Sequence, residues 1–230
     1  KRDSEFDHDT SFLRQTTVGG KPLEILLPTP DGPVKVKSYH IRLSDSCVQF
    51  FLSTDIDGNP AHWVSDMDTL YGGDVDSQIR QQILLGVGGY RLLKALKIKP
   101  SIYHINEGRP GFVAWELAGD IGYEEAKKKI VYTNHTLVAA GNPNYSIDTV
   151  KYWTAPIAQE LSLNLDEIIA PGIENNGFSI TKFAMSSASR HNAVSKVHGE
   201  YAKEQYPDIK WVSITNGIHM NRWQDSDFRN

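Results

Sequence analysis

Apolar and polar residues interleave over the first quarter of the chain, a pattern typical of half-buried β-strands. Leu23–Leu27 is a short apolar run that ends at a proline-rich turn. Over residues 34–43, apolar residues interleave with Lys and other polar residues. A third apolar run covers Cys47–Leu52. These three segments predict a β-rich region at the start of the chain.

A helical period replaces this pattern between residues 79 and 93, where apolar residues recur every three or four positions. Asp74 or Ser77 is placed to cap this helix. Its middle contains Gly86, Gly88 and Gly89, and each glycine costs about 1 kcal/mol relative to Ala in a helix interior. We therefore expect another backbone segment to approach closely at these glycines.

Strand and helix patterns alternate through the rest of the chain. The predicted strands are Ser101–Ile105, Ile130–Thr133, Ala193–Val197 and Trp211–Thr215. The predicted helices are Pro110–Leu117, Tyr123–Lys129, Ser146–Leu161, Ser179–Arg190 and His198–Gln205. Repeated strand–helix–strand units imply right-handed crossovers and a parallel sheet. We predict an α/β fold, a Rossmann-like parallel sheet with flanking helices, preceded by the β-rich segment.

Composition narrows the class of protein without naming it. The 230 residues are 40% hydrophobic, with a mean hydropathy of -0.40 and a net charge of -4, so we expect a soluble, cytoplasmic globular protein. The slightly acidic net charge does not indicate a basic surface that would bind nucleic acid. No apolar stretch approaches the roughly 20 residues that span a bilayer. Cys47 has no partner for an internal disulfide. Because the chain begins with Lys1 rather than Met, we interpret it as a piece of something longer.

Three predicted strands are followed by polar loops that contain Gly or His. These loops are Asn106–Arg109, Asn134–Thr136 and Asn216–His219. Ligands of an open parallel sheet bind beyond the carboxyl ends of its strands, and a rim of carboxylate, guanidinium, imidazole and amide groups suits the hydroxyls of a sugar. Each loop alone has a simpler interpretation as a turn or a structural His. The eight histidines show no metal-binding spacing, so we predict no metal site.

Several segments, in order, resemble the α-glucan phosphorylases. Tyr132-Thr-Asn-His-Thr136 is similar to the family's T-N-H-T segment, and His104-Ile-Asn-Glu-Gly-Arg-Pro-Gly-Phe112 to its N-E-G-H-x-x-F loop. The other matching segments are Leu70–Asp74, Gln81–Gly89, Phe178–Ala184, Asn192–Glu200 and Thr215–Trp223. The match runs from about residue 70 to 223, whereas residues 1–60 are less diagnostic.

The resemblance implies a two-Rossmann (GT-B) glycosyltransferase that cleaves α-1,4-glucans or maltodextrin with inorganic phosphate and releases glucose 1-phosphate with retained configuration. It implies three parts: a β-rich segment over 1–68, part of the N-terminal Rossmann-like domain over 69–223, and over 224–230 the start of the crossover to a C-terminal domain that is missing here. The family uses pyridoxal phosphate, bound by a lysine for which this chain has no matching motif. We therefore predict that the chain alone is inactive.

The same resemblance assigns roles to residues of the three loops. His135 would grip the hydroxymethyl oxygen of the reacting glucose, and its backbone carbonyl would face the developing oxocarbenium. Glu107 and Arg109 would line the acceptor-side sugar site. The remaining substrate-binding candidates are Asn106, Asn134, Thr136, Asn216 and Gly217, the last two at the start of the interdomain crossing. His198 and Glu200 open a helix, and we interpret them as structural.

The chain also departs from the family pattern. Arg109 stands where the family usually has His, Ala193 where it has Gly, and Met185 where it has Leu. Arg109 puts the preferred glucan length in doubt, because its length and permanent charge would reshape the acceptor site. Two alternatives stay open, a non-catalytic glucan-binding or assembly module and a nucleotide-sugar glucan synthase. We also expect self-association, because a separated domain exposes a former interdomain face.

Overall fold

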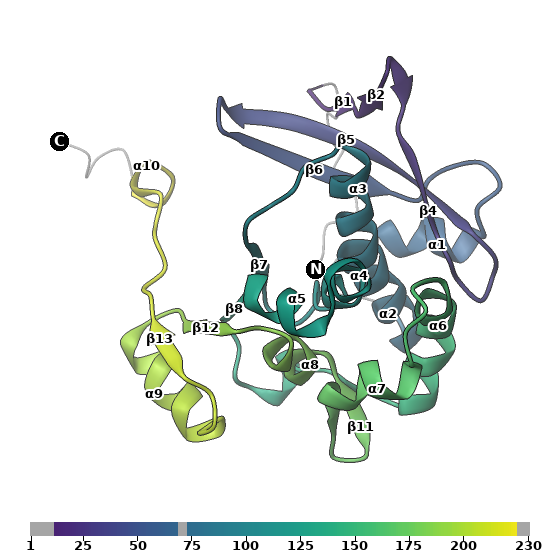
Figure 1. Ribbon diagram of the computed structural model, residues 1–230. Coiled ribbons are helices and arrows are strands. Elements are labelled where there is room, and N and C mark those ends of the chain that lie inside the picture. Colours follow the sequence, from purple (N-terminus) through teal and green to yellow (C-terminus); the bar gives the residue numbers. More distant parts are fainter. Residues whose placement is uncertain (1–11, 69–72, 225–230) are drawn as a thin grey trace.

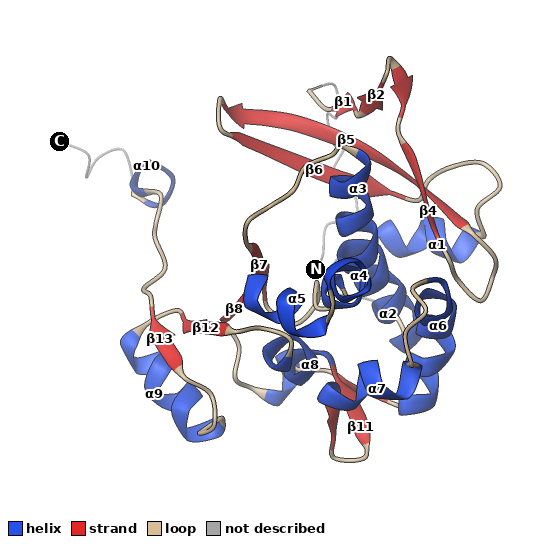
Figure 2. Cartoon of the chain, viewed as in Figure 1, coloured by secondary structure: helices blue, strands red, loops and turns tan. Residues whose placement is uncertain are grey.

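The structure is a computed structural model that describes residues 12–68 and 73–224. Figure 1 shows a long ribbon of two strands, β5 (Val34–Ser44) and β6 (Cys47–Ser53), at one end of the molecule. Helices occupy the middle, and short strands with further helices lie at the other end (Figure 2). Most of the matching segment Leu70–Asp74 lies outside the described residues.

The N-terminal region forms the strands predicted from the sequence. The predicted run Leu23–Leu27 forms β4 (Glu24–Leu27). Three further short strands were not predicted, β1 (Arg14–Gln15), β2 (Thr17–Val18) and β3 (Lys21–Pro22). β5 pairs antiparallel with β1, β4 and β6, while β2 and β3 pair with each other. Alternate side chains point inward, so Leu27, Val34 and Val36 are buried.

The predicted helix begins as expected but changes its winding at the glycines. Its three parts are α2 (Val75–Ile83), the π-helical η2 (Leu84–Gly88) and α3 (Gly89–Ala95). Asp74 caps α2, because its Oδ1 accepts a hydrogen bond of 2.7 Å from the Ser77 amide. A Cβ on Gly86 would lie 2.9 Å from the Pro110 carbonyl oxygen and from the Val113 amide nitrogen. The expected close backbone approach is therefore confirmed at Gly86.

Charged side chains tie this helix to its neighbours. Arg80 on α2 binds Asp66 through Nε and Nη2, at 2.5 and 3.0 Å, and both residues are buried. Arg91 on α3 donates from Nη1 to the Leu26 carbonyl at 2.8 Å, and its Nη2 lies 2.7 Å from Glu116. Burial raises the pKa of Glu116, and Arg91 opposes this rise. Arg91 thus joins β4 to the helical layer.

The C-terminal half contains the predicted parallel sheet. Its strands, in spatial order, are β7 (Tyr103–Asn106), β8 (Ile130–Asn134), β12 (Arg190–Ala193) and β13 (Trp211–Ser213), all parallel. The helices of the crossovers include α4 (Val113–Ile121), α5 (Tyr123–Lys129), α8 (Ile180–Ser186) and α9 (Lys196–Gln205). The predicted α/β class with a parallel sheet and flanking helices is confirmed.

Three predicted placements in this half are wrong. The third strand was expected over Ala193–Val197 but is Arg190–Ala193, because Ser195 caps α9 by accepting a hydrogen bond from the His198 amide at 3.0 Å. The preceding helix therefore ends at Ser186 instead of continuing to Arg190. Pro110 precedes α4 by three residues instead of lying in its first turn.

Several short elements were not predicted. They are α1 (Ala61–Ser65), η1 (Asp66–Asp68), η3 (Ala139–Gly141), β9 (Asn144–Tyr145), α7 (Leu165–Ile169), η4 (Ala170–Gly172), β10 (Ile173–Glu174), β11 (Gly177–Ser179) and α10 (Met220–Trp223). β9, β10 and β11 form a small antiparallel sheet beside α6 (Ile147–Glu160).

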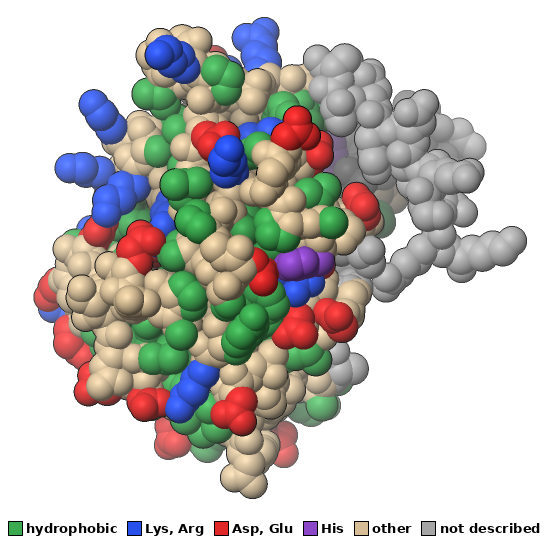
Figure 3. All heavy atoms as spheres, turned by 90° about the vertical axis from the view of Figure 1, so that its right-hand side faces the viewer, with side chains coloured by type: hydrophobic (Ala, Val, Ile, Leu, Met, Phe, Trp, Pro, Cys, Tyr) green, Lys and Arg blue, Asp and Glu red, His purple; other side chains and the backbone are tan. Residues whose placement is uncertain are grey.

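One hydrophobic cluster extends from the β-rich region to the parallel sheet. At its centre Phe112 stacks on Trp115 with ring centroids 4.4 Å apart, and Trp115 meets Phe183 edge-on at 5.3 Å. The predicted domain limits at residues 68 and 223 stay predictions. None of the described helices has the length and apolar character needed to cross a membrane. The face turned to the viewer in Figure 3 intersperses basic and acidic side chains, so it presents no continuous basic surface.

Candidate functional site

The three predicted loops meet at the carboxyl edge of the parallel sheet. The loop after β7 continues the strand pairing, because the Glu107 amide donates to the Thr133 carbonyl of β8 at 2.9 Å. The loop after β13 is held to the neighbouring strand, because the Asn216 amide donates to the Val194 carbonyl at 3.1 Å. The first bond fixes the Glu107 loop to β8, the strand that leads into His135, and the second fixes the Asn216 loop to the end of β12, which pairs with β8.

His135 lies between the other two loops. Its Nε2 is 2.7 Å from Asn106 Oδ1, and its Nδ1 is 3.5 Å from Asn216 Nδ2. The amide oxygen of Asn106 accepts and the amide nitrogen of Asn216 donates. With this orientation of the two amides, Nε2 of His135 donates to Asn106 and Nδ1 faces the Asn216 donor. The convergence of the loops predicted from the sequence is confirmed by these contacts.

Glu107 adopts a left-handed backbone conformation, with φ of 66°. Such a conformation costs a residue other than glycine about 1 kcal/mol or more and is found most often at functional sites. Its Oε1 accepts a hydrogen bond of 2.8 Å from the His135 amide. Gly108 permits the tight path that follows, because a Cβ there would lie 2.8 Å from the Thr181 backbone at the start of α8. The strain thus aims a carboxylate at the loop that carries His135.

Arg109 and Thr136 line a small cavity beside these residues. The cavity has a volume of about 190 Å³, and its walls also include Asn106, Glu107 and Thr181. Typical pockets for drug-sized ligands begin near ~300 Å³, so this cavity suits one small polar group of a ligand.

The charge of Arg109 also affects the pKa of Tyr145 on β9. Burial raises the pKa of the Tyr145 hydroxyl, while a hydrogen bond from Gln82 and the charge of Arg109 oppose the rise. The positive charge of Arg109 therefore acts on the small antiparallel sheet, while its residue lines the cavity.

Asn134 differs from the other candidates because its side chain is fully buried. Its Nδ2 donates to the Tyr132 hydroxyl at 2.9 Å and to the Thr136 carbonyl at 3.3 Å. Direct contact with a ligand does not fit this burial, and the contacts instead fix the path of the loop on either side of His135. Asn216 and Gly217 are both exposed, and nothing lies within 4 Å of the position that a Cβ on Gly217 would take.

His198 belongs to this rim, although the sequence suggested a structural role. It lies in the first turn of α9, where its ring is close to the His135 backbone and within the electrostatic reach of Glu107. Burial lowers the pKa of His198, the Glu107 carboxylate opposes this, and the charge of His135 adds to the lowering while its backbone counteracts it. The sequence feature that could have predicted this placement is the position of His198 just after the third strand, at the same edge of the sheet as the three loops. Glu200, also interpreted as structural, is exposed.

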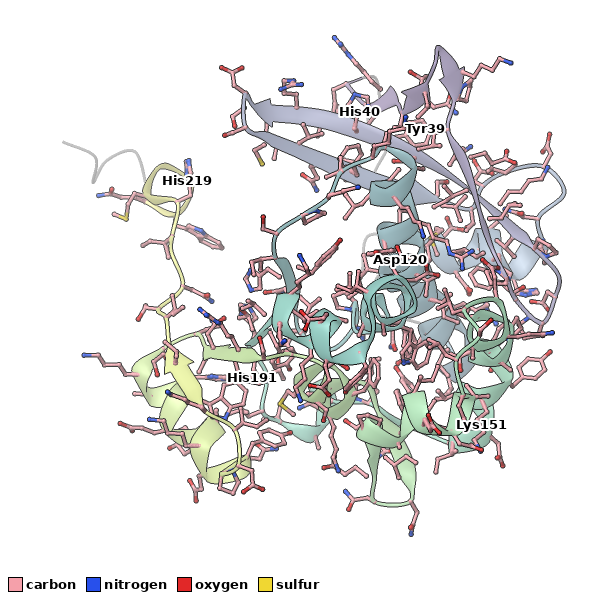
Figure 4. The ribbon with its side chains drawn as sticks, viewed as in Figure 1. Tyr39, His40, Asp120, Lys151, His191 and His219 are labelled. Carbon is pink, nitrogen blue, oxygen red and sulfur yellow. The ribbon has the colours of Figure 1, made fainter. Side chains whose placement is uncertain are left out.

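Two other histidines, His191 and His219, are labelled in Figure 4. His191 lies on β12, and His219 lies beside α10, at the far end of the segment that follows β13. His191 Nε2 is 2.8 Å from the Met185 carbonyl, on the packed side of the sheet. Among the described residues, no group of three or more His, Cys, Asp or Glu side chains is arranged to hold a metal ion.

Comparison with known proteins identifies relatives of this chain. The chain is 32% identical over 232 residues to the maltodextrin phosphorylase of Thermococcus litoralis, a match that covers 93% of this chain and 28% of the relative. It is 28% identical over 251 residues to the glycogen phosphorylase of Mycobacterium tuberculosis, covering 89% of this chain and 29% of that protein. The chain is homologous to the α-glucan phosphorylases.

This phosphorylase homologue spans less than a third of the length of both relatives. It is also 28% identical over 236 residues to an uncharacterized protein of Methanocaldococcus jannaschii, covering 99% of the chain and 44% of that protein. No protein-family model matches the chain.

A solved structure supports the fold. The catalytic domain of starch synthase IV from Arabidopsis thaliana, bound to ADP and acarbose, matches with a TM-score of 0.59 at 18% identity, over 92% of this chain and 42% of that one. The likeness confirms the predicted fold, that of the N-terminal half of a GT-B glycosyltransferase. At the level of the family, the homologues and the fold are those of glycosyltransferases.

Proposed function

We propose that this chain is part of an α-1,4-glucan phosphorylase, which transfers a glucosyl unit from glucan or maltodextrin to inorganic phosphate and releases glucose 1-phosphate with retained configuration. The observation that carries the proposal is the position of His135, held by Asn106 and Asn216 from two other loops and joined to Glu107 through its amide. Four groups that can bind hydroxyls thus gather around His135 at the edge of the sheet.

His135 orients the reacting sugar in this proposal. Its Nε2 proton, now directed at Asn106 Oδ1, is in position to turn to a hydroxymethyl oxygen of a bound glucose. Asn216 Nδ2 donates toward Nδ1 on the other side of the ring, so the two amides together fix the orientation of the imidazole. Contacts of this kind accelerate a reaction to the extent that they tighten in the transition state.

Glu107 and Arg109 bind the sugar on the acceptor side. Both line the small cavity together with Thr136. The Glu107 carboxylate already accepts from the His135 amide, so it couples the position of the acceptor sugar to the backbone of His135. Arg109 supplies several donors in a fixed plane, which suits neighbouring hydroxyls of one glucose unit.

The small cavity does not fit pyridoxal phosphate, because a Schiff base requires a lysine and no lysine lines this cavity. We propose that the lysine that binds this cofactor and the phosphate-binding residues lie in polypeptide outside this chain, and that the chain alone does not catalyse phosphorolysis.

Glucan binding by the chain alone is the first test. Calorimetric titration with maltotetraose should detect binding by the wild type and an affinity at least ten-fold weaker for His135→Ala and Glu107→Gln, because each removes a hydrogen-bonding group from the rim. His62→Ala is the matched control, because His62 lies on α1 and contacts Asp31. Equal binding by wild type and His135→Ala would contradict the assigned site.

Release of glucose 1-phosphate from maltodextrin is the second test. The longer protein encoded by the complete reading frame should be active, and His135→Ala should reduce its kcat/KM while His62→Ala does not. Glucan binding without activity in that protein would instead support a non-catalytic glucan-binding module.

A further inference from the structure

The helix α9 turns its larger apolar side chains outward instead of into the protein. Its buried residues are the small Gly199 and Ala202, and the helix packs against β12 and β13. A Cβ on Gly199 would collide with the Ser213 hydroxyl, so glycine permits this close approach. Val197 and Tyr201 lie four residues apart on one helix face and are 62% and 61% exposed. Neighbouring exposed apolar groups of this kind mark a binding surface more often than single ones do.

A groove of about 550 Å³ lies beside this face of α9, and we call it the α9 groove. One wall is formed by Tyr201, Glu204 and Gln205 of α9. The other wall is formed by Leu137 and Val138 of the loop after β8, and Val138 is 65% exposed. Figure 1 shows α9 at the edge of the molecule, beside β13. A ligand in solution therefore has access to the groove.

One loop separates the α9 groove from the candidate site. Thr136 lines the small cavity, and the next two residues, Leu137 and Val138, line the groove. Asn142 holds this loop, because its Nδ2 donates to the Thr136 carbonyl at 3.1 Å and to the Val138 carbonyl at 3.0 Å. The Asn142 side chain is fixed in turn, because its Oδ1 accepts from Thr181 at 2.8 Å. Val138 therefore has a fixed position, about 7 Å or less from Thr136.

Polar groups on the wall of the groove are available to a ligand. No described residue pairs with the Tyr201 hydroxyl or with the Glu204 carboxylate. Gln205 Nε2 is 3.3 Å from the Tyr206 hydroxyl, which leaves the amide oxygen of Gln205 as an acceptor. A glucose unit has C–H groups on its ring faces and hydroxyls around its rim. An α-glucan therefore suits this surface, with a ring face on Tyr201 and hydroxyls directed at the carboxylate and the amide.

Charge and size disfavour other ligands. The sequence of α9 contains two lysines and two glutamates, so the helix has no field of a single sign to attract a polyanion or an anionic membrane. A stable interface between proteins takes about 20–30 residues from each partner, whereas five residues line this groove. A narrow, uncharged chain of sugar units fits these limits.

We propose that the α9 groove is an accessory glucan site, which holds further units of a glucan chain whose first units lie at the site around His135. Tyr201 is the platform of this accessory site, and Glu204 and Gln205 bind hydroxyls of the same units. The proposal rests on the proposed function, because the ligand is the same glucan. Its effect is specific to chain length, so its failure is distinguishable from failure of the site around His135.

Calorimetric titration of the chain with maltotetraose and maltoheptaose tests the accessory site. The wild type should bind maltoheptaose about five-fold more tightly or better than maltotetraose, because the additional units cover the ring of Tyr201. Tyr201→Ala should lose this gain and keep the affinity for maltotetraose, whereas Tyr201→Phe should keep both, because it retains the ring. Tyr152→Ala is the matched control, because Tyr152 is 56% exposed on α6. An unchanged Tm shows that each variant is folded.

Every other result separates the two proposals. If wild type and Tyr201→Ala bind maltoheptaose equally, there is no accessory site, and the proposed function is unaffected. If maltoheptaose binds through Tyr201 while maltotetraose does not bind, the accessory site stands and the site around His135 fails. If neither glucan binds, both proposals fail. If the chain sediments as a dimer that Tyr201→Ala dissociates and Tyr152→Ala does not, a second copy occupies the groove instead.

Discussion

Gly86 is where the long helix touches the loop that carries Glu107 and Arg109, and replacing it tests how that loop is held. In Gly86→Ala the new Cβ would lie 2.9 Å from the Pro110 carbonyl oxygen and the Val113 amide nitrogen. Both are backbone atoms, so the strain cannot be relieved by rotating a side chain. The loop or the helix must move.

Gly89 provides the matched control. It lies three residues further along the same helical stretch, and nothing lies within 4 Å of the Cβ that an alanine would add. Ala is favoured over Gly by about 1 kcal/mol in a helix, so Gly89→Ala should raise the free energy of unfolding by about that amount. The same gain applies to Gly86→Ala, and the difference between the two variants isolates the overpacking.

Overpacking of one methyl group in a close-packed interior costs about 1–3 kcal/mol. Urea unfolding, followed by tryptophan fluorescence, should therefore place Gly86→Ala about 1–3 kcal/mol below Gly89→Ala in the free energy of unfolding. Gly86→Ala should also weaken maltotetraose binding, because Pro110 follows Arg109 directly. If the two variants unfold at the same urea concentration, the close approach described here is wrong.

Two further predictions concern stability. Asp66→Asn should lower the free energy of unfolding, measured by urea titration, by about 3–5 kcal/mol, because it leaves the buried Arg80 guanidinium without its charge partner. A loss below about 1 kcal/mol would mean that water solvates the Arg80–Asp66 pair. Burial lowers the pKa of His191, so between that lowered pKa and the ordinary value of about 6.5 the unfolded chain binds more protons. The contribution of His191 to stability is therefore present above pH 6.5 and lost as the pH falls through this window. In His191→Gln, the urea midpoint should decline less steeply between pH 7.5 and 5.5 than in the wild type. An unchanged slope would contradict this role of His191.

The strands and helices were predictable where periodicity and capping residues agree. Tyr123–Lys129 forms α5 with the predicted limits, and Asp74 and Ser146 cap the helices that they precede. The third strand was misplaced because Val194 and Val197 extend the apolar pattern, whereas the hydroxyl of Ser195 begins a helix. Two- and three-residue strands such as β9 and β11 carry too few positions to show a period.

The candidate site was predictable in outline but not in detail. The carboxyl ends of parallel strands must meet, so the contact of His135 with Asn106 and Asn216 follows from the sequence pattern. The left-handed conformation of Glu107 and the burial of Asn134 do not follow, because they depend on how loops pack against α8 and Tyr132. His198 was missed because a helix position alone does not say which way its ring points.

Arg91 joins parts of the molecule that are far apart in the sequence. Its guanidinium bonds to Leu26, 65 residues away in the chain, and to Glu116, 25 residues away. Contacts that close long loops cost conformational entropy, and contacts between distant residues slow folding. We therefore expect β4 to dock on the helices late in folding.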